Sequence, residues 1–286
     1  MKKCFLRFLK RYLPVQYTWL RRNWRYIPPF NIYDFFYKKH IGYKNRDLRL
    51  NKEKSVIQKF FSNNLIIRNG VFKGLNYTHS AFGSTILPKI IGSYEEPIAK
   101  WIQDVKYENY DQIIDIGSAE GYYVTGFASI LKSKIIGYEL NQYAIEENRK
   151  LISLNKKNIQ SEIQLINKFC THKELKAQIK NSRSLIFLDV EGAEVDILQP
   201  ELIPDLINSD LIVECHDALK FGIIYTLIER FSNTHEIELK VDFPRTLSLY
   251  PELSNLTTEE QQFILDERRP KGMTWARFKS LSNSLA

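Results

Sequence analysis

The stretch that most constrains the fold is Asp111-Gln-Ile-Ile-Asp-Ile-Gly-Ser-Ala-Glu-Gly-Tyr-Tyr123. Its apolar run, residues 113–116, is typical of a strand that is buried on both faces of a parallel sheet. Gly117 and Gly121 follow, and from Tyr122 onward apolar residues recur at helical spacing. The order of strand, glycine turn and helix predicts the first unit of an α/β sheet. One glycine would permit a sharp turn, and the other would permit the close approach of a ligand.

A second feature is an acid at the end of the next predicted strand. Residues 134–139 end on Glu139, which follows Gly121 by 18 residues. A carboxylate at this place can accept hydrogen bonds from both hydroxyls of a ribose, and the preceding helix start favours an anionic group. The glycines do not form the dinucleotide pattern G-x-G-x-x-G, because Ala119 and Tyr122 stand where that pattern needs glycine. Together, the two features predict a site for an adenosine-bearing ligand.

Predicted strands and helices alternate from residue 112 to residue 241, which favours an α/β fold with a doubly wound, mostly parallel sheet. A last strand is expected over 273–278. Upstream, residues 65–95 have the glycine turns typical of short strands, and Ser93 is expected to cap a helix that ends near Val105. We divide the chain into a basic aromatic segment (1–50), an accessory region with helical character (51–110) and the main domain (111–286).

Polar side chains stand at the ends of four predicted strands. In open α/β sheets, ligands bind beyond the carboxyl ends of the strands, so these side chains are expected to share one edge. A single acid at a strand end is more often a helix cap or a turn former, but four such positions at one edge predict a site. The side chains are those of Asp115, Glu139, Asp189 with Glu191, and Glu214 with His216 and Asp217.

The segment Asp189-Val-Glu-Gly-Ala-Glu194 resembles the signature that follows the fourth strand in FkbM-type methyltransferases, which use S-adenosyl-L-methionine (SAM). The pattern Asp-x-Gly-x-x-x-Gly over 115–121 resembles the first motif of SAM methyltransferases. Looser agreement extends over residues 70–278 and includes Val213-Glu-Cys-His-Asp217 and Glu267-Arg-Arg-Pro270. The resemblance implies the seven-stranded, Rossmann-like methyltransferase sheet and the O-methylation of a hydroxyl, often on a sugar or a secondary metabolite.

The resemblance also implies roles for individual residues. Asp189 and Glu191 match acids near the methyl donor and the acceptor, and we interpret both as catalytic. His216 is the candidate general base, since histidine has the most suitable unperturbed pKa, although a satisfied strand-end histidine is the alternative. No metal-binding spacing such as H-E-x-x-H occurs, so we predict no obligatory metal. The implied SAM contacts are Asp115, Gly117, Ser118, Glu120, Gly121, Tyr122, Glu139, Asn167 and Asp189.

Charge is unevenly distributed along the chain. The net charge is +8, but residues 1–50 contain 13 Lys and Arg against two acids, which gives +11 there and −3 for the rest. A mildly acidic body argues against a nucleic-acid enzyme, whose active face is usually basic. Within residues 5–13, apolar and basic positions recur at helical spacing. This pattern fits a helix at an anionic membrane surface, a helix packed on the protein's own body, or RNA binding.

The remaining composition favours a cytoplasmic protein, with residues 1–30 as a candidate contact to the inner membrane surface. No apolar run is long enough to span a membrane, and three dispersed cysteines argue against a disulfide framework. The leading hypothesis is a SAM-dependent O-methyltransferase acting on a glycan or a similar polyhydroxyl acceptor. The alternatives are a non-catalytic, membrane-associated interaction protein in glycan biosynthesis, an RNA methyltransferase and an NAD-dependent oxidoreductase. The sequence names neither the acceptor nor the oligomeric state.

Overall fold

The computed structural model describes residues 48–62, 64–270 and 272–284. Its contacts divide the chain after Phe60, whereas the sequence analysis places the boundaries after residues 50 and 110. In the first unit, residues 48–60 are helical. The predicted basic amphipathic helix lies outside the described residues. Within the described residues, no helix combines the length and the apolar character that a membrane span requires.

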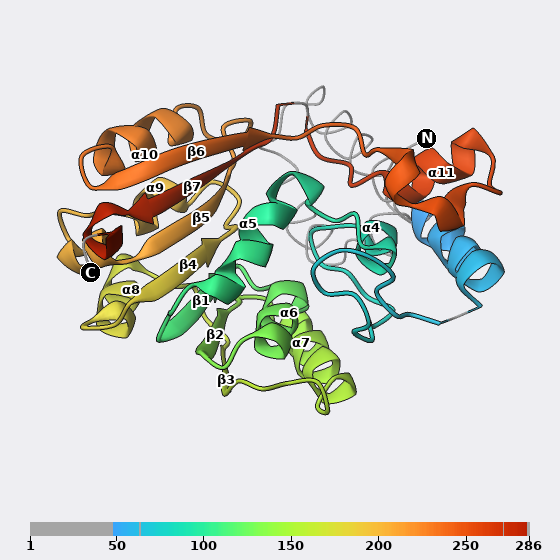
Figure 1. Cartoon of the computed structure of the whole chain (residues 1–286), viewed down its shortest axis with the longest axis horizontal. Coiled ribbons are helices and arrows are strands. Elements are labelled where there is room, and N and C mark those ends of the chain that lie inside the picture. Colours follow the sequence, from blue (N-terminus) through green and yellow to red (C-terminus); the bar gives the residue numbers. More distant parts are fainter. Residues whose placement is uncertain (1–47, 63, 271, 285–286) are drawn as a thin grey trace, which may run out of the picture. The chain divides into compact units, whose positions relative to one another are not determined.

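The second unit is built on a seven-stranded sheet with the order β3-β2-β1-β4-β5-β7-β6 (Figure 1). The strands β1 to β5 are parallel, and β7 runs antiparallel between β5 and β6. This arrangement confirms the predicted doubly wound, mostly parallel sheet of the Rossmann-like type. The strands are β1 (Gln112–Ile116), β2 (Lys134–Tyr138), β3 (Ile163–Ile166), β4 (Ser184–Leu188), β5 (Asp210–Cys215), β6 (His235–Val241) and β7 (Thr274–Ser280).

The central strands are continuous apolar runs because helices cover both faces of the sheet. Every residue of β1, β4 and β5 is buried. On one face, Ile114 and Leu188 belong to a core that includes Leu227. On the other face, Phe187 packs against Phe127 with ring centroids 6.0 Å apart. The main helices are α6 (Tyr122–Ile130), α7 (Gln142–Leu154), α8 (His172–Ile179), α9 (Glu194–Ile197) and α10 (Ile223–Phe231).

The strand register brings the predicted site residues to one edge. Ile116, the last residue of β1, lies opposite Tyr138 of β2 and Leu188 of β4. The three strands therefore end at the same level. The next residues along the chain, Gly117, Glu139 and Asp189, consequently leave the sheet side by side.

The accessory region differs from the sequence-based expectation of short strands. Residues 66 and 76 form an isolated bridge, but the run at 86–91 is a helix, α4 (Ile86–Ile91). All six of its side chains are buried, so tertiary packing decides the conformation of a short apolar run that periodicity leaves ambiguous. The helix expected after Ser93 is present, but its start is corrected, because the Ser93 hydroxyl has no hydrogen-bond partner among the described residues. The chain turns through Glu95 at φ 52°, and the helical path is η2 (Glu96–Ile98) followed by α5 (Ala99–Asp104).

Candidate functional site

A cavity of about 380 Å³ lies beyond the carboxyl ends of β1, β2, β4 and β5. Parts of the accessory region and of the connection between α11 (Thr258–Leu265) and β7 complete its walls. The structure therefore brings together most of the predicted site. Glu120, Gly121, Asn167 and Asp217 are not among the residues that line the cavity. The predicted residues that line it are Asp115, Gly117, Ser118, Tyr122, Glu139, Asp189, Glu191, Glu214 and His216.

The glycine turn after β1 packs tightly against neighbouring elements. Gly117 and Gly121 have φ values of 92° and 90°, in the left-handed region that favours glycine. A Cβ on Gly117 would collide with the carbonyl of Asp189, and a Cβ on Gly121 would collide with the side-chain amide of Asn148 in α7. The missing side chain of Gly121 thus makes room for Asn148. This differs from the expected role of admitting a ligand.

Glu139 is bound to the glycine turn. Its Oε2 accepts a hydrogen bond of 3.0 Å from the Ala119 N–H, and its Oε1 accepts one of 2.6 Å from the Asn141 N–H. A carboxylate has further lone pairs, so the group can still accept ligand hydroxyls from the cavity. Asn167 donates to the backbone carbonyls of Glu139 and Leu140 at 2.8 and 3.1 Å. Its side chain therefore supports the backbone that carries Glu139.

Asp115 lines this cavity and has one buried oxygen without a partner. The side chain is buried, with 2% exposure, and its Oδ2 has no hydrogen-bond partner among the described residues. Burial, followed by the negative charges of Asp189 and Glu139, raises the pKa of Asp115 well above its ordinary value. A ligand group that is cationic or donates hydrogen bonds would stabilise this carboxyl group, because a buried acceptor without a hydrogen bond costs free energy.

Glu120 faces away from the cavity and into the accessory region. It is wholly buried and accepts hydrogen bonds from the Tyr77 hydroxyl, from the Phe82 N–H at 2.9 Å, and from the Lys89 ammonium. Lys89 itself lines the cavity and lies 4.5 Å from the centroid of the Tyr94 ring. The carboxylate that the resemblance places at the cofactor therefore attaches the accessory region to the glycine turn.

Two other predicted contacts, Ser118 and Tyr122, form part of the cavity wall. The Ser118 hydroxyl accepts a hydrogen bond of 3.4 Å from the Asn148 amide. The Tyr122 ring packs edge-to-face against Phe72 and Tyr94, with centroids 5.2 Å apart in both pairs. Aromatic rings therefore give this side of the cavity a rigid, largely apolar wall.

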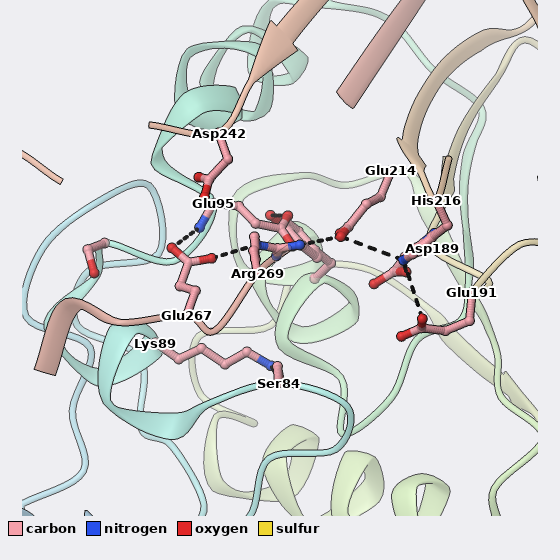
Figure 2. Close-up of polar contacts among 12 residues, drawn as sticks. Ser84, Lys89, Glu95, Asp189, Glu191, Glu214, His216, Asp242, Glu267 and Arg269 are labelled. Carbon is pink, nitrogen blue, oxygen red and sulfur yellow. Dashed lines mark hydrogen bonds and ion pairs between the residues drawn. The ribbon is translucent and has the colours of Figure 1, made fainter. Parts of the chain in front are cut away.

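His216 lies among four carboxylates that come from β5, from α9 and from the loop after β4. Figure 2 shows three of them, Asp189, Glu191 and Glu214. Its Nδ1 is 2.6 Å from Oε1 of Glu194. Its Nε2 is 3.5 Å from Oδ1 of Asp189, 3.5 Å from Oε2 of Glu191 and 3.7 Å from Oε1 of Glu214. One ring nitrogen is thus hydrogen-bonded, while the other faces acids that line the cavity.

The pKa values of His216 and Asp189 are both raised by their surroundings. Burial disfavours the charged form of His216, but the hydrogen bond with Glu194 and the charge of Asp189 outweigh it and raise the pKa above its ordinary value. Burial raises the pKa of Asp189 to about 6, although the charge of His216 opposes this shift. Groups with such shifted pKa values are suited to acid–base chemistry near pH 7.

Arg269 holds a second, buried group of charges beside this cluster (Figure 2). Its side chain is 9% exposed and forms ion pairs with Glu95, Glu214 and Glu267. Burial opposes its charge, but Glu95 and the other carboxylates raise the pKa of Arg269 well above its ordinary value. The sequence analysis assigned no role to Arg269. Its one signal there was the run Glu267-Arg-Arg-Pro270 within the looser resemblance.

Three residues of the cluster around His216 have the spacing of a cation site. Asp189, Glu214 and His216 each offer one ligand atom, and these atoms lie within 4.8 Å of one another. Glu214 is already paired with Arg269, whose charge competes with that of a metal ion. The absence of an obligatory metal therefore stays a prediction, which activity after exhaustive chelation would test.

Comparisons with known proteins give fold likenesses alone. No protein-family model and no curated protein matches the sequence. A putative O-methyltransferase from Klebsiella pneumoniae is 9% identical, with a TM-score of 0.43 over 66% of this chain and 81% of that chain. The human methyltransferase 10 domain containing protein is 11% identical, with a TM-score of 0.43 over 83% of this chain and 99% of that chain.

A third solved structure is the Pyrococcus abyssi tRNA (uracil-54, C5)-methyltransferase in complex with S-adenosyl-L-homocysteine. It is 16% identical, with a TM-score of 0.41 over 72% of this chain and 43% of that chain. At these identities and TM-scores, the three likenesses assign neither an activity nor a substrate to this chain. Its function has to be argued from the residues of its own site.

Proposed function

We propose that the protein is a SAM-dependent methyltransferase that methylates a hydroxyl group of a glycan or a similar polyhydroxyl acceptor. One observation carries the proposal: the carboxylate of Glu139 is hydrogen-bonded to the glycine turn after β1, and both line the same cavity. An acid at the end of β2 beside a glycine turn at the end of β1 is the arrangement that holds the adenosine part of a ligand in such sheets.

The cavity residues have chemistry that fits the parts of SAM. Glu139 would accept hydrogen bonds from the ribose hydroxyls, and the carboxyl group of Asp115 would receive the ammonium group of the methionine part. When bound, SAM supplies a methyl group on a positively charged sulfur. The acids that line the cavity favour that positive charge, and the buried aromatic wall at Tyr122 keeps water away from it.

The acceptor side of the proposal rests on the cluster around His216. A hydroxyl is a weak nucleophile at neutral pH and needs a base within hydrogen-bond reach. The Nε2 of His216 would take the proton, with Asp189 and Glu191 as neighbours that orient the hydroxyl and accept its hydrogen bonds. Carboxylates suit an acceptor with many hydroxyl donors and repel phosphates, which disfavours RNA. The resemblance of 189–194 to FkbM-type enzymes supports the same choice.

The first test concerns cofactor binding. In Glu139→Ala we expect the dissociation constant of SAM to rise about tenfold to hundredfold, because hydrogen bonds to a charged group contribute about 1.5–3 kcal/mol. The free energy of unfolding should fall by no more than about 1 kcal/mol, since the freed N–H groups can bind water. Isothermal titration calorimetry with SAM measures the first quantity, and urea unfolding measures the second.

Glu162→Ala is the matched control, because this glutamate lies just before β3, at the opposite edge of the sheet, and its side chain is 74% exposed. Its SAM affinity should equal that of the wild type. If Glu139→Ala bound SAM as tightly as this control, the assignment of the ribose site would be wrong. If the wild-type protein gave no heat with millimolar SAM, the non-catalytic alternative would be favoured.

The second test concerns the pH dependence of turnover. The base must be neutral to accept a proton, and its folded pKa is raised, so activity should be lost on acidification at a pH above the ordinary pKa of histidine. The acids from α9 and from the loop after β4 cause this rise of the His216 pKa against the opposing effect of burial. The measurement is kcat against pH for an acceptor identified by mass shift with labelled SAM. A profile that stays flat down to pH 5 would exclude His216 as the base.

A further inference from the structure

We infer that Glu194 is a positioning residue, which fixes the proton of His216 on Nδ1 and thereby leaves Nε2 free to act as the base. The inference deepens the proposed function and rests on it. It also joins two segments that the sequence analysis treated separately. These are the loop 189–194 after β4 and the segment 213–217 at the end of β5.

The geometry places Glu194 behind the histidine ring. Glu194 is the first residue of α9 and is fully buried. Its Oε1 is 2.6 Å from Nδ1 of His216 and also accepts a hydrogen bond of 3.2 Å from the Gly192 N–H. An ionised carboxylate can only accept hydrogen bonds, so the proton between the two groups belongs to Nδ1. In the neutral ring, Nε2 then carries the lone pair.

The loop that carries Glu194 is shaped for this contact. Glu191 has φ 53° and Gly192 has φ 104°, so two consecutive residues occupy the left-handed region. A non-glycine residue there is strained and persists only where its surroundings hold it. The turn lets Asp189 and Glu191 approach Nε2 while Glu194 reaches Nδ1 on the opposite edge of the ring. The imidazole therefore lies between Glu194, which contacts Nδ1, and the acids Asp189 and Glu191, which face Nε2.

Glu194 is not part of the cavity lining, which separates its role from ligand binding. The charged groups that face His216 are Asp189 and Glu191 from the loop after β4, Glu214 from β5, and Glu194 from α9. Among these four, Glu194 alone forms a hydrogen bond with a ring nitrogen. Removing its charge should therefore change the state of the ring and leave the cavity intact.

The experiment is nitrogen-15 NMR of the histidine side chains in the full chain without ligand. The sequence has five histidines, and the side-chain signal that disappears in His216→Gln is that of His216. In the wild type we expect a neutral His216 ring with the proton on Nδ1 and a pKa above that of ordinary histidine. In Glu194→Gln, whose amide can either donate or accept, we expect a mixture of both tautomers and a lower pKa. Glu194→Asp, which keeps the charge, should partly restore the wild-type signal.

Asp196→Asn is the matched control, because this acid lies on the same helix, is 67% exposed and pairs with Lys220. It should leave the His216 signal unchanged. A wild-type ring with its proton on Nε2, or a Glu194→Gln variant with an unchanged tautomer and pKa, would overturn the inference. The wild-type spectrum decides the point even without a folded variant. Calorimetry with SAM on the same samples tests the proposed function separately, since SAM binding can fail while the tautomer is as expected.

Discussion

Replacing His216 with alanine should lower methyl-transfer turnover by about 10²- to 10⁴-fold, the range that a positioned general base contributes. The dissociation constant of SAM should change by less than about twofold, because Asp115 and Glu139, which are proposed to bind the ammonium group and the ribose, lie at the ends of β1 and β2 and do not contact the imidazole. The effect should therefore appear in kcat. The measurements are steady-state methylation with labelled SAM and calorimetry with SAM alone.

A second buried histidine provides the control for this variant. His235 is as buried as His216, lies in β6, and makes a hydrogen bond of 2.9 Å between its Nε2 and the Ser209 carbonyl. It does not line the cavity. His235→Ala should lower the free energy of unfolding and leave kcat of the folded protein unchanged. Equal turnover in the two variants would remove His216 from the role of base and leave it as a buried structural histidine.

Replacing Arg269 with methionine should destabilise the fold by about 3–5 kcal/mol, the range seen when one partner of a buried ion pair is removed. The guanidinium pairs with three buried carboxylates, those of Glu95, Glu214 and Glu267. Without it, Glu214 and Glu95 would lose their guanidinium partner while their side chains stay largely buried. Urea unfolding at pH 7 measures the loss.

The same variant should recover part of its stability on acidification. Burial raises the folded pKa values of Glu214 and Glu267 above their ordinary values. A carboxyl whose folded pKa is raised favours the folded state at low pH, and this contribution is lost as the pH rises through the folded pKa. The deficit of Arg269→Met relative to the wild type should therefore shrink between pH 7 and pH 5, where the carboxyls can protonate instead of remaining as unpaired charges.

Arg277→Met is the matched control for Arg269→Met. Arg277 lies in β7, close in sequence to Arg269, and it pairs with the partly exposed Glu238 and lies 3.9 Å from Asp104. Ion pairs near the surface contribute about 1 kcal/mol or less, so this variant should be nearly as stable as the wild type. If Arg269→Met were no less stable than Arg277→Met, the buried network would not be what holds the connection before β7 in place.

The sequence allowed the sheet and the polar residues at the carboxyl ends of its strands to be predicted because these follow from local rules. Buried β-branched runs identify the strands, and the carboxyl ends of parallel strands meet at one edge, which brought together Asp115, Glu139, Asp189 and His216. The rule gives the edge of the sheet at which a residue lies, but it does not give the direction of each side chain. Glu120 lies in the predicted turn, yet its carboxylate points to the accessory region.

The missed residues depend on contacts between distant parts of the chain. Arg269 meets Glu95 across 174 residues of sequence and Glu214 across 55, and neither pairing has a local pattern. Glu194 lies within the segment 189–194 that resembles the family signature. Its contact with His216 forms only when α9 packs against the end of β5. The α4 helix was missed for a related reason, since its six residues are too few to show a helical period and their burial comes from the tertiary fold.

The buried contact between Lys89 and Glu120 has a consequence for protein engineering. The accessory region supplies one wall of the cavity and is secured to the glycine turn through this ammonium group. The accessory region could be replaced by a foreign segment in order to change which acceptors enter the cavity. Such a graft would succeed only when the new segment places a cation beside Glu120, as Lys89 does. Chimeras designed on loop length alone would leave the buried side chain of Glu120 without its cation, and they would misfold before any altered selectivity could be observed.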